Sequence, residues 1–172
     1  MWIPQVFNDT FVGVDGMNQM KQFWTNAQRS LFGQTHPALK NACLEFMIPI
    51  QHHCDGASFM NKVEYTIWSV SSATTRGNTF DTKMLITILE SDLLVDYVTE
   101  KEVVGYLTWC QEVLQSGLWP QKGYKGEALS GYRWQHRGES LAGPWRGAFS
   151  LWKGDLKAKV KTHGYVKRMQ QQ

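Results

Sequence analysis

The chain has 172 residues, the length of a single domain, and its 42% hydrophobic and 13% aromatic content excludes a disordered chain. The formal net charge is only +3, but residues 1–118 hold 7 Lys/Arg and 12 Asp/Glu, a net of −5, whereas residues 119–172 hold 11 Lys/Arg and 3 Asp/Glu, a net of +8. This basic third predicts an anionic partner, either lipid or nucleic acid, against the simpler alternative of a solvated basic face.

The sequence shows neither a secretory signal nor a membrane span. Residues 1–12 lack the basic region and the long apolar region of a signal peptide. No run approaches the roughly 18 apolar residues of a spanning helix. Three cysteines, at positions 43, 54 and 110, are too few and odd in number for a disulfide framework. We therefore expect an intracellular protein with free thiols.

The first predicted element is a helix over residues 18–32. Its apolar positions follow a helical period and share one face: Met20, Trp24, Ala27 and Leu31. Gly33 favours a stop at its end. Residues 44–50, LEFMIPI, fit a helix end or a strand equally well. Residues 63–71, VEYTIWSVS, alternate and are rich in β-branched and aromatic side chains, so they predict a strand.

Two further helices are predicted, over residues 82–97 and from residue 99 onward. Asp81 can cap the first, whose inward positions would be Met84, Leu85, Ile88 and Leu89. Thr99 and Glu102 form a capping box that opens the second, and Gly117 ends it. The apolar positions predicted to share one face of this helix are Val103, Leu107, Cys110 and Leu114.

From Trp119 onward glycine and aromatic residues recur, which predicts short strands joined by glycine turns. In the final strand Phe149 and Leu151 alternate, and residues 153–154 break the period as a bulge would. Beyond them one face is apolar, and the other carries Lys157, Lys159 and Lys161. The elements predict an α+β fold: after an N-terminal segment, residues 1–16, one domain over residues 17–172 with a twisted antiparallel sheet packed against two or three helices.

A search for catalytic and metal-binding motifs finds little. Residues 51–55, QHHCD, with Cys43 upstream, contain the densest set of metal ligands, His52, His53, Cys54 and Asp55. They lack the paired-cysteine spacing of structural zinc sites, so we interpret them as a polar loop. Phosphate-binding, G-x-S-x-G and H-E-x-x-H motifs are absent from the sequence. We predict a non-enzymatic protein with no catalytic residue, metal or cofactor; Cys110 is interpreted as a core residue, and a Cys-dependent hydrolase stays as a third alternative.

Aromatic rings stand beside cations in the basic third, in Tyr132-Arg133-Trp134, His136-Arg137, Trp145-Arg146 and Trp152-Lys153. Such rings can stack on bases while the cations hold phosphates. Equally, tryptophan can lie at the headgroup boundary of a bilayer while Lys and Arg attract anionic lipid. A sheet with rings inside and charges outside would produce the same alternation without any ligand.

Residues 143–165, GPWRGAFSLWKGDLKAKVKTHGY, resemble the late strand pair of rhabdovirus matrix proteins. In that family a Pro-aromatic start leads to a hydrophobic–aromatic–x–Gly step, matched here by Pro144, Trp145, Phe149, Leu151, Trp152 and Gly154. VEYTIWSV resembles the early core strand of the family, and residues 76–80, RGNTF, resemble its Arg-containing turn. Near the N-terminus, Trp2-Ile3-Pro4 resembles a motif that contributes to self-association in some members.

This resemblance implies a viral matrix protein, a structural protein that self-associates, binds the inner leaflet and the nucleocapsid, and drives virion assembly and budding. The viral glycoprotein is a further implied partner. The implied locations are the virion, the host cytoplasm and the cytoplasmic face of host membranes, with the nucleus as an additional one. The lysine-rich N-terminal region and the proline-rich budding motifs of the family have no counterpart among these residues, which suits a short, plant-infecting member.

Two sets of residues follow as candidate sites. Self-association is assigned to Trp2, Ile3 and Pro4. Membrane or nucleocapsid binding is assigned to Arg133, Arg137, Arg146, Lys153, Lys157, Lys159, Lys161, Lys167 and Arg168. The alternative that the residues leave open is a non-enzymatic protein that binds single-stranded nucleic acid.

Overall fold

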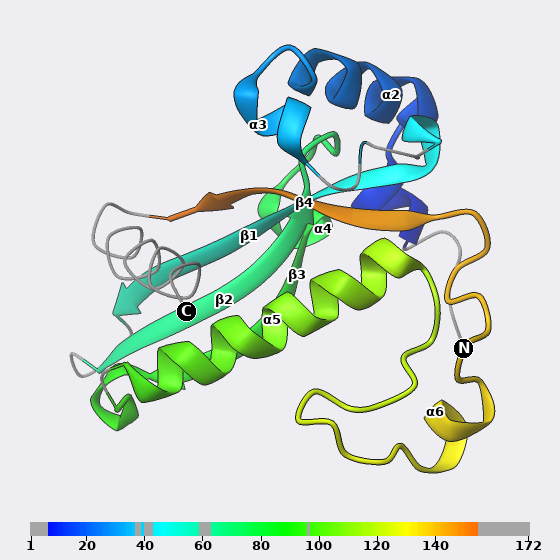
Figure 1. The fold of residues 1–172 in the computed structure, drawn as a ribbon. Coiled ribbons are helices and arrows are strands. Elements are labelled where there is room, and N and C mark those ends of the chain that lie inside the picture. The colour runs from blue at the N-terminus through cyan, green and yellow to red at the C-terminus, as the bar shows by residue number, and fades with distance from the viewer. Residues whose placement is uncertain (1–6, 37–38, 40–42, 59–62, 96, 155–172) are drawn as a thin grey trace.

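The computed structural model describes residues 7–36, 39, 43–58, 63–95 and 97–154 (Figure 1). Four strands form one sheet in the order β3-β2-β1-β4. Their bounds are Met47–Ser58 for β1, Glu64–Ser72 for β2, Lys83–Glu90 for β3 and Arg146–Lys153 for β4. The helical elements are η1 (Asn8–Val12), α2 (Gly16–Ala27), α3 (Leu31–Thr35), η3 (Leu44–Phe46), α4 (Thr79–Thr82), η5 (Ser91–Leu93), α5 (Val98–Ser116) and α6 (Gly131–Gln135).

The sheet confirms the predicted α+β class but is mixed rather than antiparallel. β1 pairs with β2, and β2 with β3, in the antiparallel sense, whereas β4 pairs with β1 in parallel. After β3 the chain crosses the sheet through α5 and returns at the opposite edge, so β4 is not joined to its neighbour by a tight turn. Such a crossover permits the parallel pairing, which the sequence pattern of one strand does not reveal.

The predicted first helix is confirmed as α2, although it ends at Ala27. Met20 and Trp24 are fully buried, as their spacing predicts. Trp24 packs with Met47 and Ala148 at the start of the sheet. A second cluster joins Met20 to Val12, Ile48 and Ile50, so the π-helical turn η1 contributes to the core.

The predicted helix from residue 99 is confirmed as α5, which lies along one face of the sheet (Figure 1). The predicted capping box is wrong, because the helix begins at Val98 and the Thr99 hydroxyl accepts a hydrogen bond from the Val95 amide. Gly117 follows it with φ +66, and its amide bonds the Val113 carbonyl at 3.0 Å. Val104 and Leu107 are buried against Cys54 and Trp68 of the sheet. The predicted inward face is shifted in part, because Cys110 is only half-buried and Leu114 is 37% exposed.

The predicted helix over residues 82–97 is wrong, because residues 83–90 form the edge strand β3. A bulge explains the error. In the pairing of β3 with β2, Trp68 faces Thr87 and Ser69 faces Leu85, so Ile86 is an extra residue. The extra residue turns Leu85 and Ile88 toward the same face. Apolar residues then recur three apart on one face, which in a sequence resembles a helical period.

The short strands predicted after Trp119 are also wrong. Residues 118–145 form turns, the short helix α6 and two isolated bridges, Leu118 with Ser140 and Lys122 with Ala128. In β4 the irregularity lies at Ser150 and not at residues 153–154. Phe149 and Leu151 therefore face adjacent positions of β1 and do not share a face. Residues 155–161 of the predicted strand lie outside the described residues.

Candidate polyanion-binding surface

The segment between α5 and β4 forms a loop, residues 118–141, that is closed at its base. The amide of Trp119 donates to the Glu139 carbonyl and the amide of Gly138 donates to the Trp119 carbonyl, both at 2.9 Å. The amide of Leu141 donates to the Gly117 carbonyl at 2.8 Å. These bonds join the two ends of the loop, and we refer to residues 118–141 as the aromatic–basic loop.

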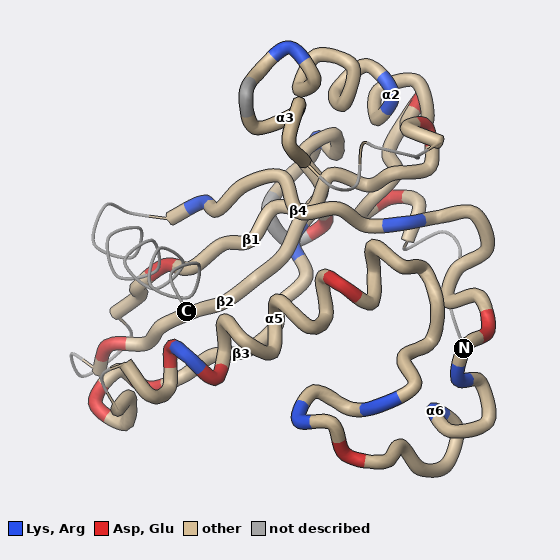
Figure 2. The backbone as a smooth tube through the Cα atoms, viewed as in Figure 1, with Lys and Arg blue, Asp and Glu red and all other residues tan. Residues whose placement is uncertain are grey.

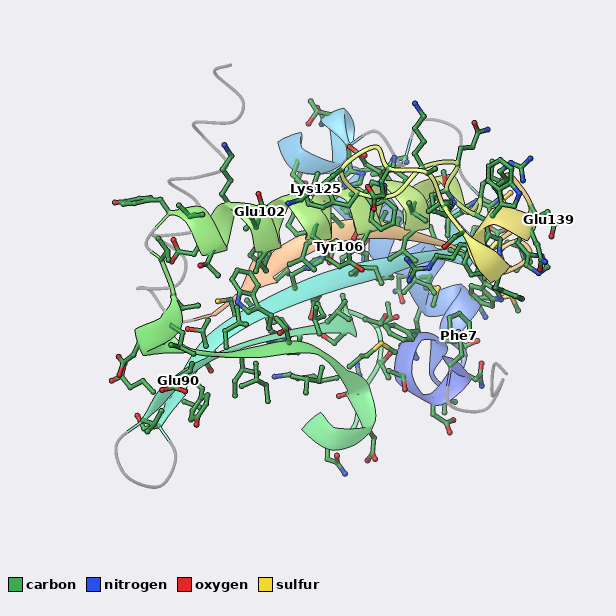
Figure 3. The ribbon with its side chains drawn as sticks, turned by 90° about the horizontal axis from the view of Figure 1, so that it is seen from below. Phe7, Glu90, Glu102, Tyr106, Lys125 and Glu139 are labelled. Atoms are coloured by element: carbon green, nitrogen blue, oxygen red, sulfur yellow. The ribbon has the colours of Figure 1, made fainter. Side chains whose placement is uncertain are left out.

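The aromatic–basic loop is held against α5. Lys125 forms an ion pair of 3.0 Å with Glu102, and the ring of Tyr124 meets Tyr106 edge-on at 5.8 Å between centroids. Figure 3 shows Lys125 beside Glu102 and Tyr106 on α5. A Cβ at Gly105 would overlap the Tyr124 hydroxyl, so the absence of a side chain there lets the loop approach the helix.

Around α6 the loop presents rings and cations together. The Arg137 guanidinium lies 3.5 Å from the centroid of the Trp134 ring and donates to the Trp134 carbonyl at 2.7 Å. Tyr132 packs against His136 at 4.1 Å and against Trp119 at 5.7 Å between centroids. Tyr132 is nevertheless 64% exposed and Trp134 48% exposed. Large rings this exposed are available to a ligand.

Arg133 extends from α6 toward the side of α5 that carries Tyr106 and Cys110. The hydrogen bond to Cys110 raises the pKa of Tyr106, and burial raises the pKa of Cys110. The charge of Arg133 acts in the opposite direction on both groups, so its guanidinium is near them. A raised pKa lowers the fraction of Cys110 present as thiolate, which is the nucleophilic form.

Arg146 has a structural position at the start of β4. Its guanidinium donates to the carbonyls of Gly143 and Trp145, at 2.9 and 2.8 Å, and packs over Gly117. Lys153 is exposed at the other end of β4, about 23 Å away at the usual rise per residue. The described candidates therefore fall into separate places: Arg133 and Arg137 on the aromatic–basic loop, with Arg146 and Lys153 at the two ends of β4. Figure 2 shows Lys and Arg positions near α6 and along β4 as separate blue segments.

Lys153 has a histidine neighbour that the sequence pattern does not predict. It faces His53 across the β1–β4 pairing. Burial, together with the charges of Lys83 and Lys153, lowers the pKa of His53 to about 4. Lys83 acts on His53 from the other side, because β3 lies beyond β2 in the sheet. It was missed because residues 83–90 were predicted to be helical.

Residues 51–55 do not form the predicted polar loop but lie within β1, and they do not converge as metal ligands. Successive residues of β1 point to opposite faces. His52 is buried beneath α5, where Nε2 lies 3.4 Å from Gln111 Oε1, whereas His53 Nε2 bonds Ser71 Oγ at 3.3 Å on the other face. Cys43 is exposed and Cys54 is buried. In the part of the chain that the structure describes, no group of three or more His, Cys, Asp or Glu residues could hold a metal ion.

Several candidate residues cannot be placed. Trp2, Ile3 and Pro4 lie outside the described residues, as do Lys157, Lys159, Lys161, Lys167 and Arg168. Within the described ranges, every helix is too short or too polar to cross a bilayer. No family model, curated protein or solved structure matches the chain. The resemblance to rhabdovirus matrix proteins therefore stays a prediction.

Proposed function

We propose that this protein is a non-enzymatic structural protein of the viral matrix type, which self-associates and binds an anionic membrane and a nucleocapsid through its basic third. The observation that carries the proposal is the aromatic–basic loop. It packs on α5 through Tyr124, which contacts Tyr106 beside Gly105, and it exposes Tyr132 and Trp134 next to Arg133 and Arg137.

The chemistry of this loop suits the headgroup region of an anionic bilayer. Tyr and Trp prefer that region because one part of the ring is apolar and the other can donate a hydrogen bond. Each Lys or Arg near an anionic surface contributes about 1 kcal/mol of attraction. The loop holds four Lys/Arg and two Asp/Glu, so one copy would bind weakly, and many copies in a lattice would bind strongly because later contacts are effectively intramolecular.

The last 18 residues add to this basic character. Residues 155–172 hold five Lys/Arg and one Asp. They begin two residues after Lys153, whose side chain is exposed. An anionic surface contacted by both the loop and this segment would meet half of the positively charged residues of the whole chain, nine of 18.

A second candidate function is binding to single-stranded nucleic acid. The stacking of Arg137 on Trp134 and the exposed ring of Tyr132 favour it. Rings and guanidinium planes of this kind stack on bases without regard to sequence. In a matrix protein the same surface would serve for nucleocapsid contact. The proposed locations are the virion, the host cytoplasm and the cytoplasmic face of host membranes, with the nucleus as an additional one and the viral glycoprotein as a further partner.

The proposal is tested by pelleting the purified chain with three ligands: vesicles of phosphatidylcholine, vesicles with 30% phosphatidylserine, and single-stranded poly(U). We expect the chain to pellet with the anionic vesicles and not with the neutral ones, with binding that weakens as salt is raised. Binding to poly(U) with no pelleting on either vesicle would favour the nucleic-acid function instead. Failure to bind any of the three would contradict both.

A further inference from the structure

β3 is an edge strand, and no described strand pairs with its outer side. Edge strands of natural sheets usually carry charges or proline in their interior, because an open edge can pair with another chain. The interior of β3, MLITIL, has neither. Its large side chains are also unusually exposed: Met84 is 50% exposed, Leu85 56% and Ile88 47%. An apolar open edge of this kind needs an explanation.

The sequence of β3 is complementary to itself in the antiparallel direction. Lys83 is its first residue and Glu90 its last, and neither forms an ion pair among the described residues. When two copies are aligned so that Lys83 of one faces Glu90 of the other, Met84 faces Leu89 and Leu85 faces Ile88. Opposite charges then meet at both ends, and two apolar pairs lie between each end and the central Ile86–Thr87 pair. Opposite charges and apolar side chains are favourable cross-strand partners.

The bulge at Ile86 makes this alignment geometrically consistent. Residues that face each other in an antiparallel pair must point to the same face of the sheet. In a regular strand Leu85 and Ile88 would point to opposite faces. Because Ile86 is an extra residue opposite β2, Lys83, Leu85, Ile88 and Glu90 all point to one face, and Met84 and Leu89 point to the other. In the Lys83–Glu90, Met84–Leu89 and Leu85–Ile88 pairs, both side chains therefore point to the same face of the sheet.

We propose that the outer edge of β3 pairs with β3 of a second copy, antiparallel about a two-fold axis between Ile86 and Thr87. The pairing makes one continuous sheet through both copies, a self-complementary interface of the kind that closed dimers use. It deepens the proposed function by giving self-association a surface, and in that sense it rests on the proposed function. In Figure 3 Glu90 lies far along the sheet from the loop residue Glu139, so the dimer leaves the aromatic–basic loop free.

The charge pairs are tested by sedimentation velocity at rising concentration and low salt. Lys83→Glu alone places a carboxylate opposite Glu90 twice in each dimer, and Glu90→Lys alone places an ammonium opposite Lys83 twice. Each should weaken the dimer roughly tenfold, and the double variant Lys83→Glu/Glu90→Lys should restore it to near the wild-type dissociation constant. A wild-type chain that stays monomeric, or single variants that associate like wild type, would overturn the proposal.

The register is tested by cross-linking in a Cys43→Ser/Cys110→Ser background, which keeps the buried Cys54. An equal mixture of Leu85→Cys and Ile88→Cys proteins, treated with a short bis-thiol reagent, should give mainly the mixed dimer by intact mass. Equal yields of all three dimers would overturn the register. Arg133→Glu/Arg137→Glu in the same assays separates the two proposals: loss of vesicle binding with an unchanged dimer supports the β3 interface, and a lost dimer counts against an interface independent of the loop.

Discussion

The indole Nε1–H of Trp24 donates a hydrogen bond of 2.6 Å to the carbonyl oxygen of Met47, and so ties α2 to the first residue of β1. Trp24 is fully buried, and its ring also meets Phe23 edge-on at 5.0 Å between centroids. One side chain thus provides both apolar packing and a polar anchor. The hydrogen bond between Trp24 and Met47 therefore helps to position α2 on the sheet.

Replacing Trp24 with Phe is expected to lower the free energy of unfolding by about 1–3 kcal/mol, because the buried Met47 carbonyl loses this donor. Urea unfolding followed by circular dichroism measures the change. The exposed Trp134→Phe is the matched control and should stay within about 0.5 kcal/mol of wild type. Equal effects of the two substitutions would mean that the indole hydrogen bond contributes nothing.

Gly117 and Gly126 offer a matched pair of glycine substitutions. Both have positive φ, +66 and +81, but a Cβ at Gly117 would overlap the Arg146 guanidinium, whereas the space around Gly126 is open. Gly126→Ala should therefore cost only the backbone strain, about 1 kcal/mol. Gly117→Ala should cost more, since Arg146 must move and lose its bonds to the Gly143 and Trp145 carbonyls. Thermal unfolding of the two variants would show similar losses if Arg146 is not held there.

Acid should destabilise the protein through its buried histidines. Burial lowers the pKa of His53 from 6.5 to about 4, with smaller contributions from Lys83 and Lys153, and burial also lowers the pKa of His52. Between these pH values the unfolded chain binds more protons than the folded chain, so the free energy of unfolding falls as the pH drops from about 6.5 to about 4. Urea midpoints across this range should fall less in His53→Gln than in wild type. Parallel curves for the two proteins would show that His53 does not contribute to the loss of stability in acid.

The lysines that alternate after β4 provide a separate prediction on vesicle binding. Changing Lys157, Lys159 and Lys161 to Glu reverses three positive charges in the basic third. We expect pelleting with anionic vesicles to be abolished, because each Lys near an anionic surface contributes about 1 kcal/mol of attraction. The circular-dichroism spectrum, measured alongside, should be kept. Undiminished vesicle binding at moderate salt would restrict the binding surface to the aromatic–basic loop.

The sequence predicted best those elements whose signals are local. α2 was found from the spacing of Met20 and Trp24, and the end of α5 from Gly117, because helix faces and caps involve residues a few positions apart. The strand over residues 63–71 was found from its alternation, and β2 confirms it. Each of these elements is determined by residues within its own segment of the chain.

The incorrect predictions concern elements whose structure depends on contacts between segments far apart in the sequence. β3 carries a bulge opposite Trp68, and the extra residue imitates a helical period. The parallel pairing of β4 depends on the crossover through α5, about 50 residues long, which no local pattern encodes. For the same reason Arg146, predicted as a binding residue, packs over Gly117 of the chain itself. Likewise, the position of His53 between the charges of Lys83 and Lys153 was not predicted.

The central claim, that the aromatic–basic loop binds an anionic membrane, is tested most directly by two charge-reversal variants with the same net charge. Arg133→Glu/Arg137→Glu changes the loop, and Lys21→Glu/Arg29→Glu changes exposed residues on and just after α2, above the sheet in Figure 1. In pelleting assays with phosphatidylserine vesicles, we predict that the loop variant loses most of its binding while the α2 variant retains it. Equal losses in both variants would show that only net charge matters and would contradict the claim.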